Sequence, residues 1–443
     1  MPLHRVDPAR IAALAAELRT RIGERAVRDD DGALDRASTD GSHLSPVIRS
    51  QFPLGRAQLV AYPTSSEQIA EVVGAAVRHG VPITPRGLGT ANYGQTLPMA
   101  GGLVLDTTRA RAILELGEGF ATCEPGVRMD TIESEAAKTG QQLLMYPSTV
   151  YSTIGGFVSG GSGGTGSIEH GMLHRGFVTA LDVVHAVPDA RLVHLDGAAT
   201  EPYLHKYGTA GIIARVTVRL EPLRDWRALY ASFPEERGML LSVREVSAVD
   251  PVPRLVSGDP AELAAALPDD PAIPKGRASL RVIVDASAVP ATTAIVERHG
   301  GHVEDVREGV EATMALSMQS YNHAIEWLQK REPDTWFHVE VSGDGLIDRH
   351  EELVAIYPEG MLHIEGQRGR PIGMLAGHYT SPEAVWAGFE RIEALGIGFH
   401  NPHQWFVDYE PEATRALART TDPQGLLNPG KLATPDVRTG SQR

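Results

Sequence analysis

Apolar positions in the first half of the chain follow two alternating patterns. The segment 7–27 carries Ile11, Leu14, Leu18 and Ile22 at helical spacing, which predicts an amphipathic helix. Short apolar runs bounded by turn residues then predict strands, and two further amphipathic stretches between them predict helices. The strands are expected at 58–62, 82–85, 102–105, 120–124, 177–187 and 212–220, and the helices at 69–79 and 130–139. This alternation of strands and helices predicts an α/β unit.

The pattern changes near residues 221–223, where we expect a domain boundary. Beyond it a second unit of strands and helices is expected. Its strands are predicted at 280–284 and 337–341, and helices at 320–330, 382–395 and 412–419. The Pro- and Asp-rich stretch 251–274 predicts a surface connection with one short helix. The final ten residues are expected to be disordered.

Length and charge narrow the class of protein. A chain of 443 residues suggests two or three domains, and its net charge of −15 argues against a nucleic-acid partner. No apolar run is long enough to span a bilayer, and the N-terminus does not resemble a signal peptide, so a cytoplasmic protein is expected. The single cysteine, Cys123, rules out an intrachain disulfide and is predicted to be a small buried apolar residue.

A glycine-rich loop follows the strand predicted at 82–85. Residues 85–95 read PRGLGTANYGQ, in which glycines allow positive φ and close approach of a ligand to the backbone. Successive N–H groups in such a loop can bind an anion such as a pyrophosphate. Because short glycine motifs are weak signals, an ordinary turn is an equally good interpretation of this motif alone.

A second loop, 146–167, is dense in glycine, serine and threonine. Its hydroxyl groups can bind phosphate or flavin oxygens, and residues 153–156 can begin a helical turn whose N–H groups face an anion. A flexible linker is the alternative, but Ile154, Phe157 and Val158 interrupt the glycines and favour an ordered segment. The partial dinucleotide fingerprint at 161–166 lacks a preceding strand and a following helix, so we interpret it as a coincidence of composition.

Five separated motifs together resemble a known family. They are residues 85–87, 94–95, 152–156, 206–213 and 422–431. In this order they resemble the FAD-binding domain of the vanillyl-alcohol oxidase and p-cresol methylhydroxylase (PCMH) superfamily, which includes enzymes similar to D-lactate dehydrogenase and glycolate oxidase. The resemblance implies an α+β fold, with a PCMH-type FAD-binding domain of two α/β subdomains and an α+β cap domain containing an antiparallel sheet.

The resemblance also implies domain limits and cofactor contacts. The domains expected are an N-terminal helical segment 1–44, an FAD-binding domain 45–222, a substrate or cap domain 223–411, and a C-terminal segment 412–443 that returns to the FAD-binding domain. The expected FAD contacts are Arg86, Gly87, Leu88, Gly89, Thr90, Ala91, Asn92, Gly94, Gln95, Pro147, Ser148, Ser152, Thr153, Ile154, Gly155, Gly156, Gly160, Gly163, Ile168, Gly211, Ile212, Ile213, Asn428 and Lys431. Relatives often link FAD to a histidine of the first loop, which is absent here, so noncovalent FAD is expected. Attachment through a histidine or tyrosine of the cap domain stays open.

The candidate catalytic and substrate-binding residues lie in the expected cap domain. One branch of the superfamily has a His-x-Gly-Asp-Gly-Asn-x-His metal motif, but residues 342–350 lack its first histidine and its asparagine. We therefore predict a turn at 342–350 and no metal. Histidine or tyrosine can act as the base for a hydroxyl proton, and arginine can hold a carboxylate. The catalytic candidates are Tyr321, His323, His378 and His403, and the substrate-binding candidates are Arg368 and Arg370.

These features favour an FAD-dependent oxidoreductase, either an oxidase or a dehydrogenase. The substrate is expected to be a small alcohol or 2-hydroxy acid whose C–H hydride passes to flavin N5, and oxygen or another acceptor would reoxidise the flavin. The alternatives are a biosynthetic FAD enzyme with an internal-redox, cyclising or eliminating outcome, a non-catalytic flavin-binding protein, and a nicotinamide-only dehydrogenase. The sequence also leaves a homodimer open.

Overall fold

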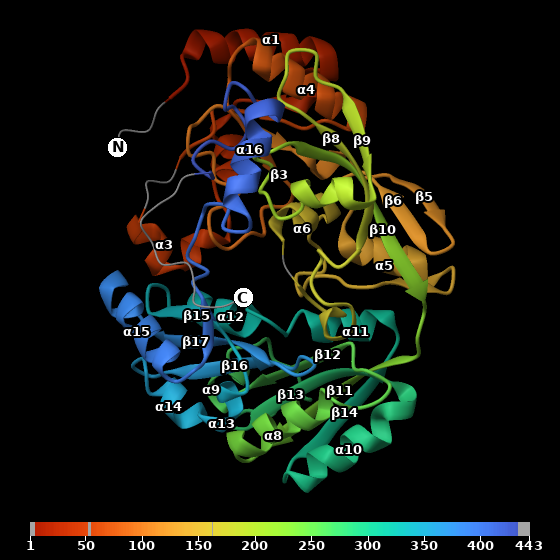
Figure 1. The fold of residues 1–443 in the computed structure, drawn as a ribbon, viewed down its shortest axis with the longest axis vertical. Coiled ribbons are helices and arrows are strands. Elements are labelled where there is room, and N and C mark those ends of the chain that lie inside the picture. The colour runs from red at the N-terminus through yellow and green to blue at the C-terminus, as the bar shows by residue number, and fades with distance from the viewer. Residues whose placement is uncertain (1–4, 52–54, 162, 433–443) are drawn as a thin grey trace.

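The computed structural model describes residues 5–51, 55–161 and 163–432. Its described part contains three β-sheets, and helices cover their faces (Figure 1). The two smaller sheets lie in the upper half of the view, and the eight-stranded sheet lies in the lower half. Helix α16 (Pro411–Thr421), coloured blue in Figure 1, returns to the upper half beside elements from the start of the chain.

The first sheet has the strand order β1-β2-β4-β3, in which β2 and β3 each run parallel to β4. Its strands are β1 (Val27–Arg28), β2 (Leu59–Ala61), β3 (Ile83–Arg86) and β4 (Leu103–Asp106). Helices α1 (Pro8–Ile22) and α4 (Ser66–Arg78) bury their apolar faces against this sheet. Two short helices, α2 (Asp31–Ala37) and α3 (Pro46–Gln51), lie in the stretch before β2. The apolar runs at 58–62, 82–85 and 102–105 therefore form strands as predicted.

The second sheet is antiparallel and is centred on β10 (Ile212–Pro222), which pairs with three other strands. The other strands are β5 (Ile113–Gly117), β6 (Phe120–Cys123), β7 (Gln141–Leu143), β8 (Val178–Val184) and β9 (Leu192–Asp196). The helices of this part are α5 (Met129–Ala137), α6 (Ile154–Gly160) and α7 (Ser167–His170). Cys123 is fully buried on β6, and burial raises its pKa to about 12, which confirms its prediction as a buried apolar residue.

The third sheet has eight strands in the order β14-β11-β13-β12-β16-β17-β15-β18 and is antiparallel throughout. Its strands are β11 (Trp226–Phe233), β12 (Leu255–Asp259), β13 (Ala278–Asp285), β14 (His302–Glu308), β15 (Trp336–Ser342), β16 (Met361–Glu365), β17 (Ile372–His378) and β18 (Gly398–His400). Its helices are α8 (Glu236–Val246), α9 (Ala261–Ala264), α10 (Val289–Arg298), α11 (Val310–Ser317), α12 (His323–Arg331), α13 (Gly345–Asp348), α14 (His350–Val354) and α15 (Pro382–Ala394).

Two predictions for this region differ from the structure. The stretch 251–274 contains the short helix that was predicted, α9, but it is not a surface connection, because it also contains β12, a fully buried strand between β13 and β16. The proline and aspartate residues in this stretch made the short apolar part of β12 difficult to recognise from the sequence pattern. The helix predicted from residue 320 begins at His323, because Tyr321 has a left-handed backbone with φ of +53°. The final ten residues lie outside the described part, and the domain limits stay predictions.

A buried ion pair joins the second sheet region to the third sheet. Arg254, directly before β12, donates to Oε1 of Glu133 on α5 at 2.6 Å and to the carbonyl of Leu143 at 2.7 Å. The two charged side chains are 3% and 1% exposed. The backbone contributes as well, since Gly166 N–H donates to the Arg254 carbonyl at 2.8 Å. These contacts fix the third sheet against the loops that precede it.

Candidate active site

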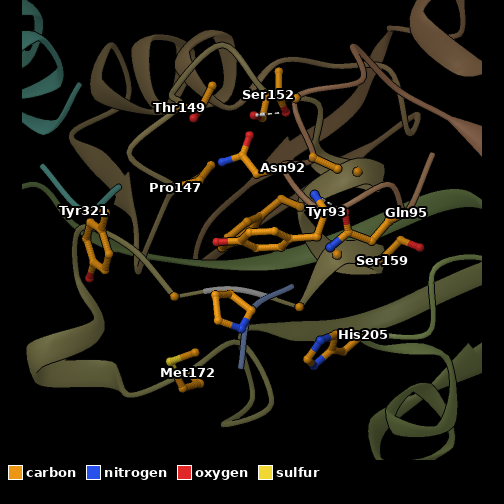
Figure 2. A pocket seen from close by; sticks show the side chains of 18 of the residues that line it. Asn92, Tyr93, Gln95, Pro147, Thr149, Ser152, Ser159, Met172, His205 and Tyr321 are labelled. Carbon is orange, nitrogen blue, oxygen red and sulfur yellow. Dashed lines mark hydrogen bonds between the residues drawn. The ribbon is translucent and has the colours of Figure 1, made fainter. Parts of the chain in front are cut away.

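A cavity of about 1040 Å³ lies between the glycine-rich loops and one end of the eight-stranded sheet. Its walls combine described residues drawn from the stretches 85–96 and 147–175 with side chains from β15, β16, β17 and β18. Figure 2 shows Asn92, Tyr93 and Ser152 from the two loops facing the same space as Tyr321 and Met172. The three segments, far apart in sequence, therefore form one site.

The first loop brings a partly buried cation to the cavity. Arg86, the last residue of β3, lines the cavity, and burial lowers the pKa of its guanidinium. Its side chain donates a hydrogen bond to the Thr96 hydroxyl at 3.3 Å, and no carboxylate of the described residues lies within ion-pair distance of it. A partly buried cation without a close carboxylate is suited to an anionic ligand.

The glycines of both loops allow close packing that a side chain would prevent. A Cβ atom on Gly87 would lie 2.2 Å from the Thr153 hydroxyl, and one on Gly155 would lie 2.6 Å from Pro125. The Thr153 side chain accepts a hydrogen bond from Gly156 N–H and caps α6, so the helical turn expected at 153–156 is present. The hydroxyls of Thr90 and Ser152 are 2.9 Å apart and tie the two loops together (Figure 2).

The C-terminal segment supports the first loop on the side that faces away from the cavity. Lys431 is fully buried and donates to the Gly94 carbonyl, and burial lowers its pKa to about 7. The Asn428 amide donates to the carbonyls of Gln95 at 3.0 Å and Tyr207 at 2.8 Å. Both residues fix the loop without lining the cavity.

The sheet side of the cavity carries a row of residues across five strands, which we call the charged row because four of its five members are charged. It contains Asp259, His363, Met374, Glu340 and His400, one from each of β12, β16, β17, β15 and β18, and all but Asp259 line the cavity. Cross-strand register pairs Met374 with both His363 and Glu340, and Glu340 with His400. Asp259 and His363 are joined by a 2.8 Å hydrogen bond.

His363 is clamped between two carboxylates. Its Nδ1 lies 2.8 Å from Asp259, and its Nε2 lies 2.8 Å from Glu365. Burial opposes the charged imidazolium, but the two carboxylates outweigh it and raise the pKa of His363 to about 9. Arg281 donates to the far oxygen of Asp259, so the cluster is compensated in charge. All four side chains are almost completely buried.

His400 has the same arrangement in a more accessible position. Its Nδ1 lies 2.7 Å from Glu340, and its Nε2 lies 2.7 Å from Asp408. Burial again works against the charge, but the carboxylates raise the pKa of His400 to about 9. His400, Glu340 and Asp408 all line the cavity.

The sequence comparisons identify the loop side of this cavity. Residues 57–196 match the family model described as an FAD binding domain. They form an FAD-binding domain. The Arg86 guanidinium and the closely packed glycines of both loops fit this cofactor, and the prediction of FAD is confirmed.

Curated relatives are identical to this chain at about a quarter to a third of the aligned residues. An uncharacterised FAD-linked oxidoreductase of Mycobacterium tuberculosis is 26% identical over 200 residues, covering 42% of this chain and 43% of that protein. A D-lactate dehydrogenase of Archaeoglobus fulgidus is 27% identical over 200 residues, covering 43% of this chain and 44% of the other. The glycolate oxidase subunit GlcD of Bacillus subtilis is 34% identical over 179 residues, covering 37% of each. The matched stretch spans less than half the length of these relatives.

Solved structures match nearly the whole chain. An alkyldihydroxyacetonephosphate synthase has a TM-score of 0.73 at 16% identity, covering 97% of this chain and 86% of that one. A 4-ethylphenol oxidase from Gulosibacter chungangensis has a TM-score of 0.65 at 18% identity, covering 97% and 98%. At these identities the likeness shows the fold, and it confirms the PCMH-type FAD-binding fold with an antiparallel sheet in the second half.

Most of the residues expected to contact FAD line the cavity. The exceptions are Gly94, Ile154, Ile168, Gly211, Asn428 and Lys431, which lie behind its surface. Their contact with FAD stays a prediction, and the structure gives Lys431 and Asn428 the role of supporting the first loop.

The structure brings only one of the four catalytic candidates to the cavity surface. Tyr321 lines it, donating its hydroxyl to the Gly164 carbonyl at 2.8 Å and its N–H to Glu365 at 2.6 Å. His323 bonds Thr149 at 2.9 Å behind the wall, and His378 packs on Trp336 at the far end of β17. These positions do not support a catalytic role for either histidine.

His403 is fully buried outside the cavity lining, where its Nε2 lies 2.8 Å from the His338 carbonyl. Burial lowers the pKa of His403 to about 3 and that of His338 to about 4. Both rings are therefore neutral at physiological pH, and His338 bonds the hydroxyl of Tyr93 at 2.9 Å. Of the two arginine candidates, Arg370 lines the cavity and Arg368 does not.

Sequence reasoning missed the charged row. Its members are isolated residues on separate strands, and they meet only through the cross-strand register. The period-two alternation HVEVS at 338–342, which places His338, Glu340 and Ser342 on one face, was the available signal. The described residues contain no cluster able to hold a metal ion, and no described helix could cross a membrane.

Proposed function

We propose that this protein is an FAD-dependent oxidoreductase that oxidises a C–H bond bearing a hydroxyl group on a small organic molecule. The observation that carries the proposal is the composition of the cavity. One side is the FAD-binding domain, and the other presents ionised carboxylates held by imidazolium groups. The names of the curated relatives, which are FAD-linked oxidoreductases and dehydrogenases, support the same reaction class.

FAD supplies the acceptor for the hydride when it is bound. The chain has to bind the cofactor, orient the hydroxyl and accept its proton. Arg86 and the two glycine-rich loops would hold the pyrophosphate. The charged row offers carboxylate oxygens as proton acceptors. Tyr321 joins the loop at Gly164 to Glu365 and would position the two sides relative to each other.

We propose noncovalent binding of FAD, because the first loop offers Thr90, Ala91 and Asn92 where relatives carry a linking histidine. An absorbance spectrum of the purified protein before and after acid precipitation tests both statements. Flavin bands that pass into the supernatant support noncovalent FAD, whereas bands that stay with the pellet refute it. Anaerobic bleaching of the bands by an alcohol or hydroxy acid supports the oxidoreductase, and bound flavin that no substrate of these classes reduces contradicts it.

A further inference from the structure

Glu340 is the most accessible carboxylate of the cavity. Three acidic side chains line the described cavity, namely Glu340, Glu365 and Asp408. The side chain of Glu340 is 38% exposed, while those of Glu365 and Asp408 are 2% and 5% exposed. A ligand in the cavity therefore meets Glu340 first.

His400 keeps Glu340 ionised and fixed. Burial raises the cost of a charge on Glu340, but the neighbouring imidazolium outweighs it, so the pKa of Glu340 lies below its usual value. The two residues face each other across β15 and β18, and the bond uses only Oε2 of Glu340. Its Oε1 makes none of the hydrogen bonds seen among the described side chains.

The imidazolium of His400 is not itself a base or a free donor. Asp408 engages its second nitrogen at 2.7 Å, so both N–H groups are already bonded to carboxylates. His363, the other charged imidazole of the row, is bonded on both sides in the same way. The row therefore presents hydrogen-bond acceptors, and not donors, to a substrate.

Building on the proposed oxidoreductase function, we propose that Glu340 receives the hydroxyl proton of the substrate, and that the substrate is an alcohol with no carboxylate on the reacting carbon. In this step the O–H bond would break and its proton would pass to Glu340. FAD, when bound, would accept the hydrogen of the C–H bond together with its electron pair as a hydride, so that the substrate loses two electrons and becomes a carbonyl compound while the flavin gains them.

The second half of the proposal follows from charge. In a 2-hydroxy acid the carboxylate lies about 3 Å from the hydroxyl, and at such a distance from Glu340 two like charges repel strongly in a partly buried site. The cationic Arg370 lies at a different position along the sheet from Glu340. Its guanidinium lies beside Gly398 and Ser342, the pair two residues along β15 and β18 from Glu340 and His400. Two residues along a strand span about 7 Å, so Arg370 is placed for a distal polar or anionic group.

Matched substrate pairs test the charge argument. The holoenzyme is mixed anaerobically with 1,2-propanediol or lactate, ethylene glycol or glycolate, and benzyl alcohol or mandelate, and flavin bleaching is followed. We expect the neutral member of at least one pair to reduce the flavin at least 100-fold faster than its acid. Faster reduction by the acids overturns the inference and leaves the oxidoreductase intact. Bleaching by no member of the panel contradicts the oxidoreductase function as well.

Variants of Glu340 test the proton transfer. With the best alcohol, Glu340→Gln should lower the flavin reduction rate constant by about 100-fold or more, with flavin content and substrate dissociation constant changed less than threefold. Glu340→Asp should recover part of the rate, and the exposed Glu351→Gln on α14 is the matched control. A Glu340→Gln enzyme that reduces its flavin within threefold of the wild-type rate overturns the proposal, as does a loss explained entirely by weaker binding.

Discussion

Replacing Glu133 by glutamine tests whether the buried ion pair with Arg254 holds the third sheet against the FAD-binding domain. Glu133 uses both oxygens, Oε1 for Arg254 at 2.6 Å and Oε2 for the N–H of Leu143 at 2.8 Å. Glutamine offers one acceptor oxygen and one NH₂ group. Whichever way the amide turns, either the guanidinium or the Leu143 N–H meets a donor.

The magnitude follows from the burial of the pair. A hydrogen bond to a charged group contributes about 1.5–3 kcal/mol, and removing one member of a buried ion pair costs about 3–5 kcal/mol because a buried charge is left uncompensated. At 3% exposure, Arg254 cannot recover its hydration without opening the interface. We therefore expect Glu133→Gln to lower the free energy of unfolding by about 3–5 kcal/mol.

Denaturant unfolding of the holoprotein measures this loss. Tryptophan fluorescence suits the assay, because Trp226 lies at the same interface and its indole donates to Gln142 at 2.7 Å. The matched control is Glu135→Gln on the same helix, where the exposed pair with Lys138 contributes about 0–1 kcal/mol. A loss under 1 kcal/mol for Glu133→Gln would refute the reasoning.

Three further predictions concern the loops, the thiol and acid stability. Gly155→Ala should strongly reduce the flavin content of a folded protein, because its Cβ would lie 2.6 Å from Pro125, whereas Gly32→Ala on the exposed face of α2 should retain full flavin content by absorbance. Cys123 should not react with a thiol reagent in the native protein and should react once per chain in denaturant, since it is buried with a raised pKa. His338 and His403 are held neutral with pKa values of about 4 and about 3, below the usual 6.5, so the stability they contribute is present above pH 6.5 and is lost as pH falls toward 3. Protonation of each ring should lower the free energy of unfolding by about 1 kcal/mol per pH unit in that window. A melting temperature that does not change between pH 6.5 and 4.5 would contradict this.

The elements that the sequence predicts well are those in which local pattern and burial agree. Apolar runs such as 102–105 and 212–220 form β4 and β10, and the glycine-rich loops line the cavity as expected. β12 was missed because its five residues include a serine, a glycine and an aspartate, and only pairing with both neighbours buries them.

The charged row could not be predicted for a related reason. Which histidine meets which carboxylate depends on the register of antiparallel strands that are far apart in sequence, as for His363 with Asp259 and His400 with Glu340. Choosing histidines by their aromatic or glycine-rich neighbours selected His378 and His403, which lie outside the cavity lining. Local sequence indicates which residues could perform the chemistry, but cross-strand pairing decides which of them meet.

The eight-stranded sheet lies between two segments of the chain that meet in the same half of the molecule. The chain leaves β10 for β11 within three residues, and after β18 it returns through α16 to pair Leu427 with Ile83 of β3. Both ends of this unit are thus anchored in the same half of the molecule. A unit connected in this way can change its side chains without altering the connections of the cofactor loops or of Lys431 behind them. The chain therefore separates the residues on the sheet side of the cavity from those that support the cofactor loops.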